Sequence, residues 1–169
     1  MRVLGVDPGT GRLGWAIVEK EKGKESLIDC GCIETPAHTD LNVRLEIIFN
    51  TLNRIIKENK PDEASVEDLF FATNRKTVMS VGAARGVVLL ACQLAKLRIS
   101  SYTPLQIKSA ITGYGSADKK QVEFMVKQIL KSSVIVREGN DRGDLLDDTV
   151  DAIAAALTHL SHTGAKIGS

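Results

Sequence analysis

Four acidic side chains stand where they could bind divalent metal ions. Asp7 ends a short apolar run and precedes a Pro8-Gly9 turn, and Glu67 lies in a second run suited to a strand. Asp148 and Asp151 are three residues apart at the start of an expected helix and therefore share one face. Oxygen ligands favour Mg²⁺, with Mn²⁺ as an alternative, over zinc. Two such ions about 4 Å apart could activate water and stabilise the leaving oxygen of a phosphoryl displacement.

Each acid also has an ordinary structural explanation. Asp before Pro-Gly commonly closes a turn through its own backbone, and Glu67 could lie on a solvated edge strand. Strand alternation sends Glu67 and Asp68 to opposite faces without choosing between them. Aspartates at a helix start complement the helix dipole, although five aspartates between positions 141 and 151 exceed what capping needs. Carboxylates packed together without metal would repel one another, which raises their pKa values.

Positive charge is concentrated in the middle of the chain. The net charge is +1, yet residues 1–73 and 132–151 are each acidic by four charges, whereas residues 74–131 contain ten Lys/Arg and two Asp/Glu. A basic region beside acidic centres suggests an anionic partner. On its own the pattern is weak evidence, because helix surfaces are often locally basic.

The composition indicates one compact globular domain. The chain has 169 residues, of which 43% are hydrophobic. It contains no apolar stretch of about 20 residues and no secretory pattern at its start, so we expect a cytoplasmic protein. Three cysteines fit a reducing compartment. Cys30 and Cys32 should face the same side of a strand, and we expect buried thiols because no further ligands stand at zinc spacing.

Apolar periodicity predicts an α/β domain with a mixed sheet, in the order βββ-α-β-α-β-α-α. Strands are expected at 3–6, 12–20, 25–35, 64–71 and 99–103, and helices at 41–59, 75–97, 116–131 and 145–161. The segments 104–115 and 132–144 read as a polar segment and a charged loop. We expect Thr39 or Asp40, Ser116 or Asp118, and Asp144 to cap helices. Gly82 and Gly86, four apart on one helix face, would allow close approach by the sheet or by a second subunit.

Taken in order along the chain, four stretches resemble the RuvC family of Holliday-junction resolvases. They are Val6-Asp7-Pro8-Gly9-Thr10; Glu67-Asp68-Leu69-Phe70-Phe71 with Asn74 and Ala84-Arg85-Gly86-Val87; Gly113-Tyr114-Gly115-Ser116-Ala117-Asp118-Lys119; and Asp148-Thr149-Val150-Asp151-Ala152 leading to Leu157-Thr158-His159. The resemblance implies an RNase H-like fold with a mixed five-stranded sheet flanked by helices. It also implies a homodimer that makes paired Mg²⁺-dependent nicks in four-way DNA junctions during homologous recombination and DNA repair, beside the branch-migration proteins RuvA and RuvB.

The resemblance also assigns roles to individual residues. It places the family's four metal-binding acids on Asp7, Glu67, Asp148 and Asp151, with two ions per site, and thereby chooses Glu67 over Asp68. It places a base-stacking aromatic on Phe70, where stacking is worth about 1–3 kcal/mol, although Phe70 could equally be a core residue. Further expected DNA contacts are Asn74, Arg75, Lys76, Lys108, Lys119 and Lys120.

Two lysines and one additional aspartate have a more specific expectation. Lys108 and Lys119 match family lysines near the scissile phosphate, where they could neutralise transition-state charge, although both could be ordinary surface residues. Asp147 departs from the usual pattern and could share or take over a metal-ligand role. The role of His159, farther along roughly the same helix side, is left open.

Three other functions are compatible with parts of the sequence. Sugar kinases and actin-like ATPases place a turn similar to Asp7-Pro8-Gly9-Thr10-Gly11 after their first strand. Those folds need two such domains, and the chain contains no second phosphate loop. A non-catalytic RNase H-like DNA-binding relative would be expected to lack one of the four acids. A relative that cleaves RNA or RNA–DNA hybrids is the remaining alternative.

Overall fold

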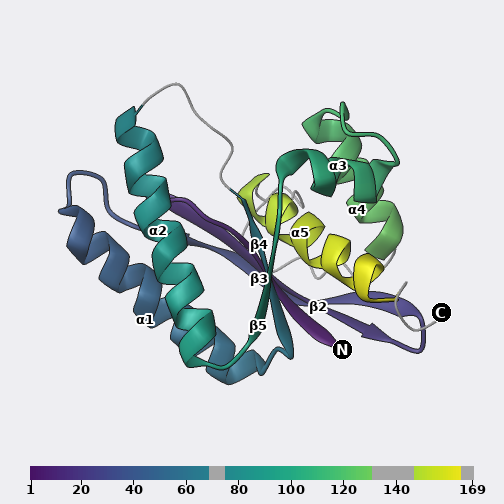
Figure 1. Ribbon diagram of the computed structural model, residues 1–169, viewed down its shortest axis with the longest axis horizontal. Helices are drawn as coiled ribbons and strands as arrows, with labels where there is room; N and C mark the ends of the chain where they lie inside the picture. Colours follow the sequence, from purple (N-terminus) through teal and green to yellow (C-terminus); the bar gives the residue numbers. More distant parts are fainter. Residues whose placement is uncertain (69–74, 131–146, 165–169) are drawn as a thin grey trace, which may run out of the picture.

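A computed structural model describes residues 1–68, 75–130 and 147–164 of the chain (Figure 1). The described elements, in chain order, are β1 (Arg2–Asp7), β2 (Arg12–Glu21), β3 (Lys24–Glu34), α1 (Leu41–Asn59), β4 (Glu63–Glu67), α2 (Arg75–Leu94), β5 (Arg98–Tyr102), α3 (Pro104–Thr112), α4 (Lys119–Leu130) and α5 (Asp147–Gly164). None of the helices in these ranges is long and apolar enough to cross a membrane.

The strands form one mixed five-stranded sheet in the order β3-β2-β1-β4-β5. Strands β1, β2 and β3 pair antiparallel, and the two-residue turn between β2 and β3 has φ values of 49° at Lys22 and 80° at Gly23. Such turns match the twist of the strands that they join. Strands β4 and β5 add in parallel to β1. The carboxyl ends of β1, β4 and β5 therefore lie at the same edge of the sheet.

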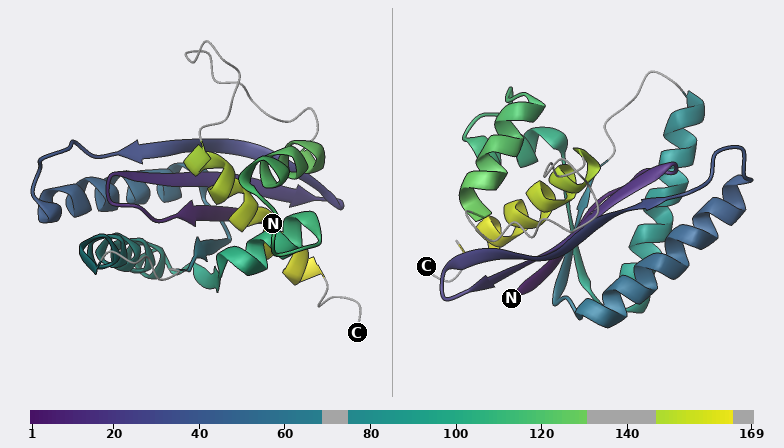
Figure 2. Two further views of the ribbon diagram at one scale, coloured as in Figure 1. Left: turned by 90° about the horizontal axis from the view of Figure 1, so that it is seen from above. Right: turned by 180° about the vertical axis from the view of Figure 1, so that it is seen from behind.

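Helices cover both faces of this sheet (Figures 1 and 2). Helices α1 and α2 pack on one face, and α3, α4 and α5 pack on the other. Strand β1 lies in the middle and supplies Val3 to the α5 side and Leu4 and Val6 to the α1–α2 side. Burial on both faces explains why β1 reads as a continuous apolar run rather than an alternating one.

Helix α5 approaches the sheet closely because the facing strands contain glycines. A Cβ atom added at Gly5 would lie 2.0 Å from the carbonyl oxygen of Ala152, and one added at Gly14 would lie 1.8 Å from that of Asp148. Ala152 and Ala156 of the helix, both fully buried, lie against Gly5. The start of α5 is therefore held against β1 and β2 by backbone-to-backbone packing.

Most of the predicted elements are confirmed, with boundary shifts, and one expectation is wrong. The segment 104–112 forms helix α3 instead of a polar loop. Its start has Pro104 in the first turn and a capping box in which Thr103 and Gln106 satisfy each other's backbone N–H groups. Strand β4 ends at Glu67, earlier than expected, and α2 ends at Leu94.

The predicted caps have different outcomes. Asp118 accepts a hydrogen bond from the Gln121 amide at 2.9 Å, as an N-cap does. Asp40 stands at the start of α1 but makes no capping bond with its side chain. The charged loop 132–144 and the proposed cap Asp144 lie outside the described residues. A Cβ atom at Gly86 would meet nothing within 4 Å, so close packing of Gly86 against the sheet is wrong.

Candidate active site

Two of the four predicted acids lie side by side at the carboxyl edge of the sheet. Strands β1 and β4 are parallel neighbours, and their register pairs Val6 with Val66. The next residue on each strand is Asp7 and Glu67, so both carboxyl groups are delivered to the same place. The Glu67 carboxyl donates a hydrogen bond to the Asp7 carboxylate. Asp68 follows the end of β4 and forms an ion pair with Arg85 at 3.0 Å instead.

Helix α5 brings the other two acids to this pair. Burial, then repulsion by Asp151 and Asp148, raises the pKa of Asp7 to about 6. Burial, then repulsion by Asp7 and Asp151, raises the pKa of Glu67 to about 8. The four acids thus interact electrostatically as one cluster. Between these two pKa values, Asp7 and Glu67 together hold one proton.

The two predicted catalytic lysines lie at the same cluster. Lys108 of α3 and Lys119 of α4 line a cavity of about 180 Å³ together with Glu67, Asp151 and several apolar residues. The Lys119 ammonium lies 3.4 Å from the Asp151 carboxylate. The cavity therefore brings two carboxylates and two lysines together at one place.

Sequence reasoning missed one participant, Arg12. Its Nε atom lies 2.8 Å from Oδ2 of Asp148 and 3.8 Å from Oε1 of Glu34. The Sγ atom of Cys32 is 3.9 Å from the same Asp148 oxygen. These contacts join the start of β2 and the end of β3 to the start of α5. They span more than a hundred residues, and neither apolar periodicity nor motif spacing gives a signal for such a contact.

The cysteines only partly match the expected buried thiols. Cys92 is buried, whereas Cys30 and Cys32 are half-buried, and the structure shows all three as free thiols. Burial is the main cause that raises the pKa of Cys32, and the nearby Asp148 raises it further, against the opposing hydrogen bond to Arg12. Cys32 is therefore a protonated neighbour of the acidic cluster and not a reactive thiolate.

The four carboxylates suit hard divalent cations in their chemistry, because they supply only oxygen ligands. Within the described ranges, no three His, Cys, Asp or Glu side chains are already arranged around a metal position. Each of the four carboxyl groups already has another partner. Asp148 pairs with Arg12, Asp151 pairs with Lys119, and Asp7 bonds to Glu67. A metal ion would have to replace these contacts with its own.

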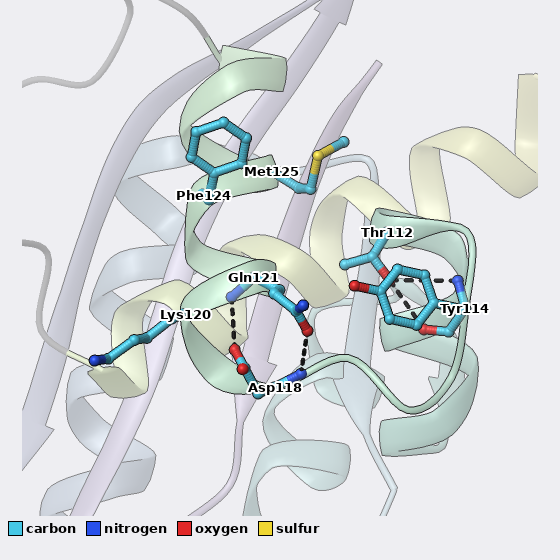
Figure 3. Close-up of a pocket in the computed structure, with 7 residues that line it drawn as sticks. All are labelled: Thr112, Tyr114, Asp118, Lys120, Gln121, Phe124 and Met125. Atoms are coloured by element: carbon cyan, nitrogen blue, oxygen red, sulfur yellow. Dashed lines mark hydrogen bonds between the residues drawn. The ribbon is translucent and has the colours of Figure 1, made fainter.

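Other predicted site residues lie elsewhere or cannot be placed. Phe70 and Asn74, and the side chains of Arg75, Lys76 and Asp147, lie outside the described residues. Lys120 lines a second cavity, of about 290 Å³, on the outer side of α3 and α4. Figure 3 shows this cavity between the ring of Phe124 on α4 and the ring of Tyr114 in the loop that follows α3. Its residues are Thr112, Tyr114, Asp118, Lys120, Gln121, Phe124 and Met125.

Solved structures define the class to which this fold and site belong. Thermus thermophilus RuvC in complex with a Holliday junction substrate superimposes with a TM-score of 0.86 at 30% identity, covering 98% of this chain and 96% of that one. The yeast mitochondrial Holliday junction resolvase Ydc2 shares the fold alone, with a TM-score of 0.68 at 14% identity, covering 93% of this chain and 78% of that one. The fold is the RNase H-like fold of such resolvases, as predicted.

Sequence comparisons then show the family. The model of the family "Crossover junction endodeoxyribonuclease RuvC" matches residues 3–159. A crossover junction endodeoxyribonuclease RuvC from Fusobacterium nucleatum is 42% identical over 167 residues, covering 99% of this chain and 84% of that protein. Another from Chloroflexus aurantiacus is 45% identical over 159 residues, covering 94% and 92%. This chain belongs to the RuvC family of crossover junction endodeoxyribonucleases.

Proposed function

We propose that this chain resolves four-way DNA junctions by paired, Mg²⁺-dependent nicks, in the cytoplasm, during homologous recombination and DNA repair. The observation that supports it most is the cluster at the ends of β1 and β4. Burial, together with repulsion among the four carboxylates there, raises the pKa values of Asp7 and Glu67 to about 6 and about 8. The chain also belongs to a family of crossover junction endonucleases. The nuclease domain would span residues 1–169, and RuvA and RuvB would be its partners.

Asp7, Glu67, Asp148 and Asp151 would hold the divalent ions, two per site, with Mn²⁺ able to replace Mg²⁺. Bound metal of this kind supplies Lewis acidity and an activated water at neutral pH. The protein's own contribution is the fixed edge of parallel strands, which places Asp7 beside Glu67, and the start of α5, which adds the two aspartates. Deprotonation of Glu67, whose pKa is about 8, must accompany metal binding.

The lysines would hold and neutralise the scissile phosphate. Lys108 and Lys119 line the cavity that also contains Glu67 and Asp151, so at the proposed site they would lie near the negative charge that develops in phosphodiester hydrolysis. Lys119 pairs with Asp151 at 3.4 Å and would turn from this carboxylate to a phosphate oxygen. Phe70, Asn74, Arg75, Lys76 and Lys120 remain proposed DNA contacts from the family resemblance.

An exposed apolar stripe on α2 supports the proposed homodimer. Met79, Leu90 and Leu94 are 77%, 51% and 62% exposed, and helical geometry places them on one side of α2. Gly86 lies on the same side with open space around it. An apolar stripe of this kind on a single surface usually marks an interaction site. A symmetric dimer through α2 would supply the two active sites that paired nicking needs.

Cleavage of synthetic DNA tests the proposal. We expect nicking of a four-way junction in Mg²⁺ and far less cleavage of a linear duplex or of an RNA–DNA hybrid. Equal cleavage of junction and duplex would contradict junction resolution, and preferred cleavage of the hybrid would favour the RNA-directed alternative. Absence of cleavage in both Mg²⁺ and Mn²⁺ would favour the non-catalytic relative.

Asp148→Asn tests the acidic cluster itself. It should abolish nicking while junction binding in metal-free buffer persists or tightens, because one repulsive charge near phosphate is gone. Asp147→Asn is the matched control, with the same chemical change one residue earlier. We expect it to cleave normally. If Asp148→Asn still cleaves and Asp147→Asn does not, the metal-ligand role belongs to Asp147.

A further inference from the structure

A chain of polar side chains ties the far end of α5 to the sheet. The Nε2 atom of His159 lies 2.5 Å from Oε2 of Glu63, at the start of β4, and its Nδ1 atom lies 2.9 Å from the hydroxyl of Tyr102, at the end of β5. Arg98 completes the chain by an ion pair with the other oxygen of Glu63. One arrangement satisfies every group, in which Tyr102 donates to His159 and His159 donates to Glu63.

The central residues of this hydrogen-bonded network, His159 and Glu63, are buried. The side chain of His159 is 3% exposed and that of Glu63 is 10% exposed. Burial alone would raise the pKa of Glu63, but the hydrogen bonds from Arg98 and His159 outweigh it, so the pKa lies below its ordinary value. Glu63 is therefore an ionised carboxylate whose partners are fixed in position. Removing one partner of such a buried group leaves an unsatisfied polar atom, which is costly.

Other contacts also hold α5 against the sheet. Ala152 and Ala156 lie against Gly5, and the backbone of Asp148 lies against Gly14. The larger apolar residues of α5 are buried in the core on the same side of the sheet: Val150, Ile153, Leu157 and Leu160. Ser65 adds one hydrogen bond, from its hydroxyl to the carbonyl of Ala155 at 2.7 Å. The hydrogen bonds of His159 differ from the apolar contacts because they weaken steeply when the distance or the angle between the partners changes. They therefore add a directional constraint on the axial position of α5.

We propose that His159 is a positioning residue, which through Glu63 and Tyr102 sets the axial position of α5 and thereby places Asp148 and Asp151 against Asp7 and Glu67. His159 lies eight residues beyond Asp151, about 12 Å along the helix, so it acts through the helix and not on the substrate. Glu63 and Glu67 are the two ends of the same strand, β4. The same strand therefore carries the hydrogen-bond partner of His159 at one end and a member of the acidic cluster at the other. The inference rests on the metal-binding role proposed above.

A small axial shift is enough to matter for catalysis. A displacement of about 1 Å at reacting groups can cost about 100-fold in rate, and loss of supporting contacts around ligands typically costs about 10- to 100-fold in metal affinity. The axial rise of a helix is about 1.5 Å per residue. Slippage of α5 by less than one residue would therefore take the two aspartates out of position while leaving the fold intact.

Three variants test the proposal on the full-length protein. Tyr102→Phe removes one hydrogen bond and is expected to fold. His159→Leu removes both bonds of the imidazole, and His159→Gln restores a donor to Glu63. The matched control is Leu52→Ala, which opens a cavity in the buried α1 side of the sheet without touching α5. Three readouts are compared: thermal stability, Mn²⁺ binding by paramagnetic resonance without DNA, and single-turnover cleavage of a junction.

We expect Tyr102→Phe and His159→Leu to weaken Mn²⁺ binding and cleavage by about 10- to 100-fold, with partial rescue in His159→Gln. Leu52→Ala should lose thermal stability but bind Mn²⁺ as the wild type does. If His159→Leu and Tyr102→Phe change Mn²⁺ binding no more than Leu52→Ala does, the positioning role is wrong and the chain of polar groups is structural only.

A fourth readout separates this inference from the proposed function. Amide hydrogen exchange at the start of α5, in the metal-free chain, should increase in His159→Leu and not in Leu52→Ala. If the wild type binds no Mn²⁺, the metal-binding proposal fails, and increased exchange still supports positioning by His159. Unchanged exchange in both His159→Leu and Tyr102→Phe would overturn it.

Discussion

At the scale of single residues, the site is defined by buried carboxyl groups that repel one another. Asp7 and Glu67 come from neighbouring strand ends, and their pKa values rise to about 6 and about 8 because both are buried and both face further carboxylates. The folded chain therefore holds protons that the unfolded chain releases. Strongly raised pKa values of this kind are typical of functional sites, where closely packed carboxylates can bind a cation.

The stability of the metal-free chain should therefore fall as pH rises. Unfolded, Asp7 and Glu67 titrate near 3.8 and 4.5, and folded near 6 and 8. Between pH 4 and about 8 the folded state binds more protons, so the free energy of unfolding decreases with pH across this range. Thermal unfolding in a chelator, from pH 5 to 8, measures the decrease.

Glu67→Gln supplies the control for this pH dependence. The amide removes the titration with the larger shift, so the decrease should become shallower between pH 6 and 8. Added Mg²⁺ should raise the melting temperature of the wild type most at the upper end of the range, where the carboxylates are ionised. A wild type whose melting temperature rises with pH in the chelator would contradict the shifts.

At the scale of elements, the position of α5 depends on glycines in the strands that face it. Gly14 has no room for a side chain, because a Cβ atom there would lie 1.8 Å from the carbonyl oxygen of Asp148. This close approach brings the backbone of Asp148, a proposed metal ligand, against β2. The glycine is thus part of the site although it offers no functional group.

Gly14→Ala should displace the start of α5 and destabilise the chain. Overpacking a tight site costs about 1–3 kcal/mol, and the displaced atom here is backbone, which cannot turn away. Urea unfolding measures the loss, and Mn²⁺ binding should weaken with it. Gly11→Ala is the matched control, since its Cβ would meet only the guanidinium tip of Arg44 at 3.2 Å. Equal, small losses in both variants would argue against steric placement of α5.

Much of this arrangement could be predicted from the sequence because it follows from local patterns. The apolar spacing of Leu45, Ile48, Leu52 and Ile55 predicts α1, and strand ends predict that Asp7 and Glu67 meet. Helix α3 was missed because only Ile107 and Ile111 are buried along it, too few for clear periodicity, although Thr103-Pro104 and Gln106 are a start signal. The pairing of Arg12 with Asp148 depends on how α5 crosses β2, which no local pattern encodes.

At the scale of the whole molecule, the sheet separates two tasks. Helices α3, α4 and α5 cover one face and α1 and α2 cover the other (Figure 2). The acids and lysines lie on the side of α3, α4 and α5, and the exposed apolar stripe lies on α2. A dimer through α2 would leave the cavity of each subunit open. It would also place two equivalent sites at a fixed separation, as two symmetric cuts require.

Leu90→Glu should convert the proposed dimer to a monomer. A charge buried in an apolar interface is strongly unfavourable, so sedimentation should give a mass near 18.3 kDa for the variant and twice that for the wild type. The variant should still nick, but cuts in opposite strands should no longer be paired. Val43→Glu, at a residue of α1 that is 41% exposed, is the matched control. A monomeric wild type would refute the α2 dimer.

The ion pairs around the acids give the metal-free site its own counterions. Arg12 neutralises Asp148 and Lys119 neutralises Asp151, so the resting cluster is less negative than its four acids suggest. A divalent cation held by these carboxylates, as proposed, would displace both positively charged side chains. Metal binding would then release one guanidinium and one ammonium group as it adds the charge of the ion. The released groups would be available to a polyanion, so binding of metal and binding of DNA would be thermodynamically coupled.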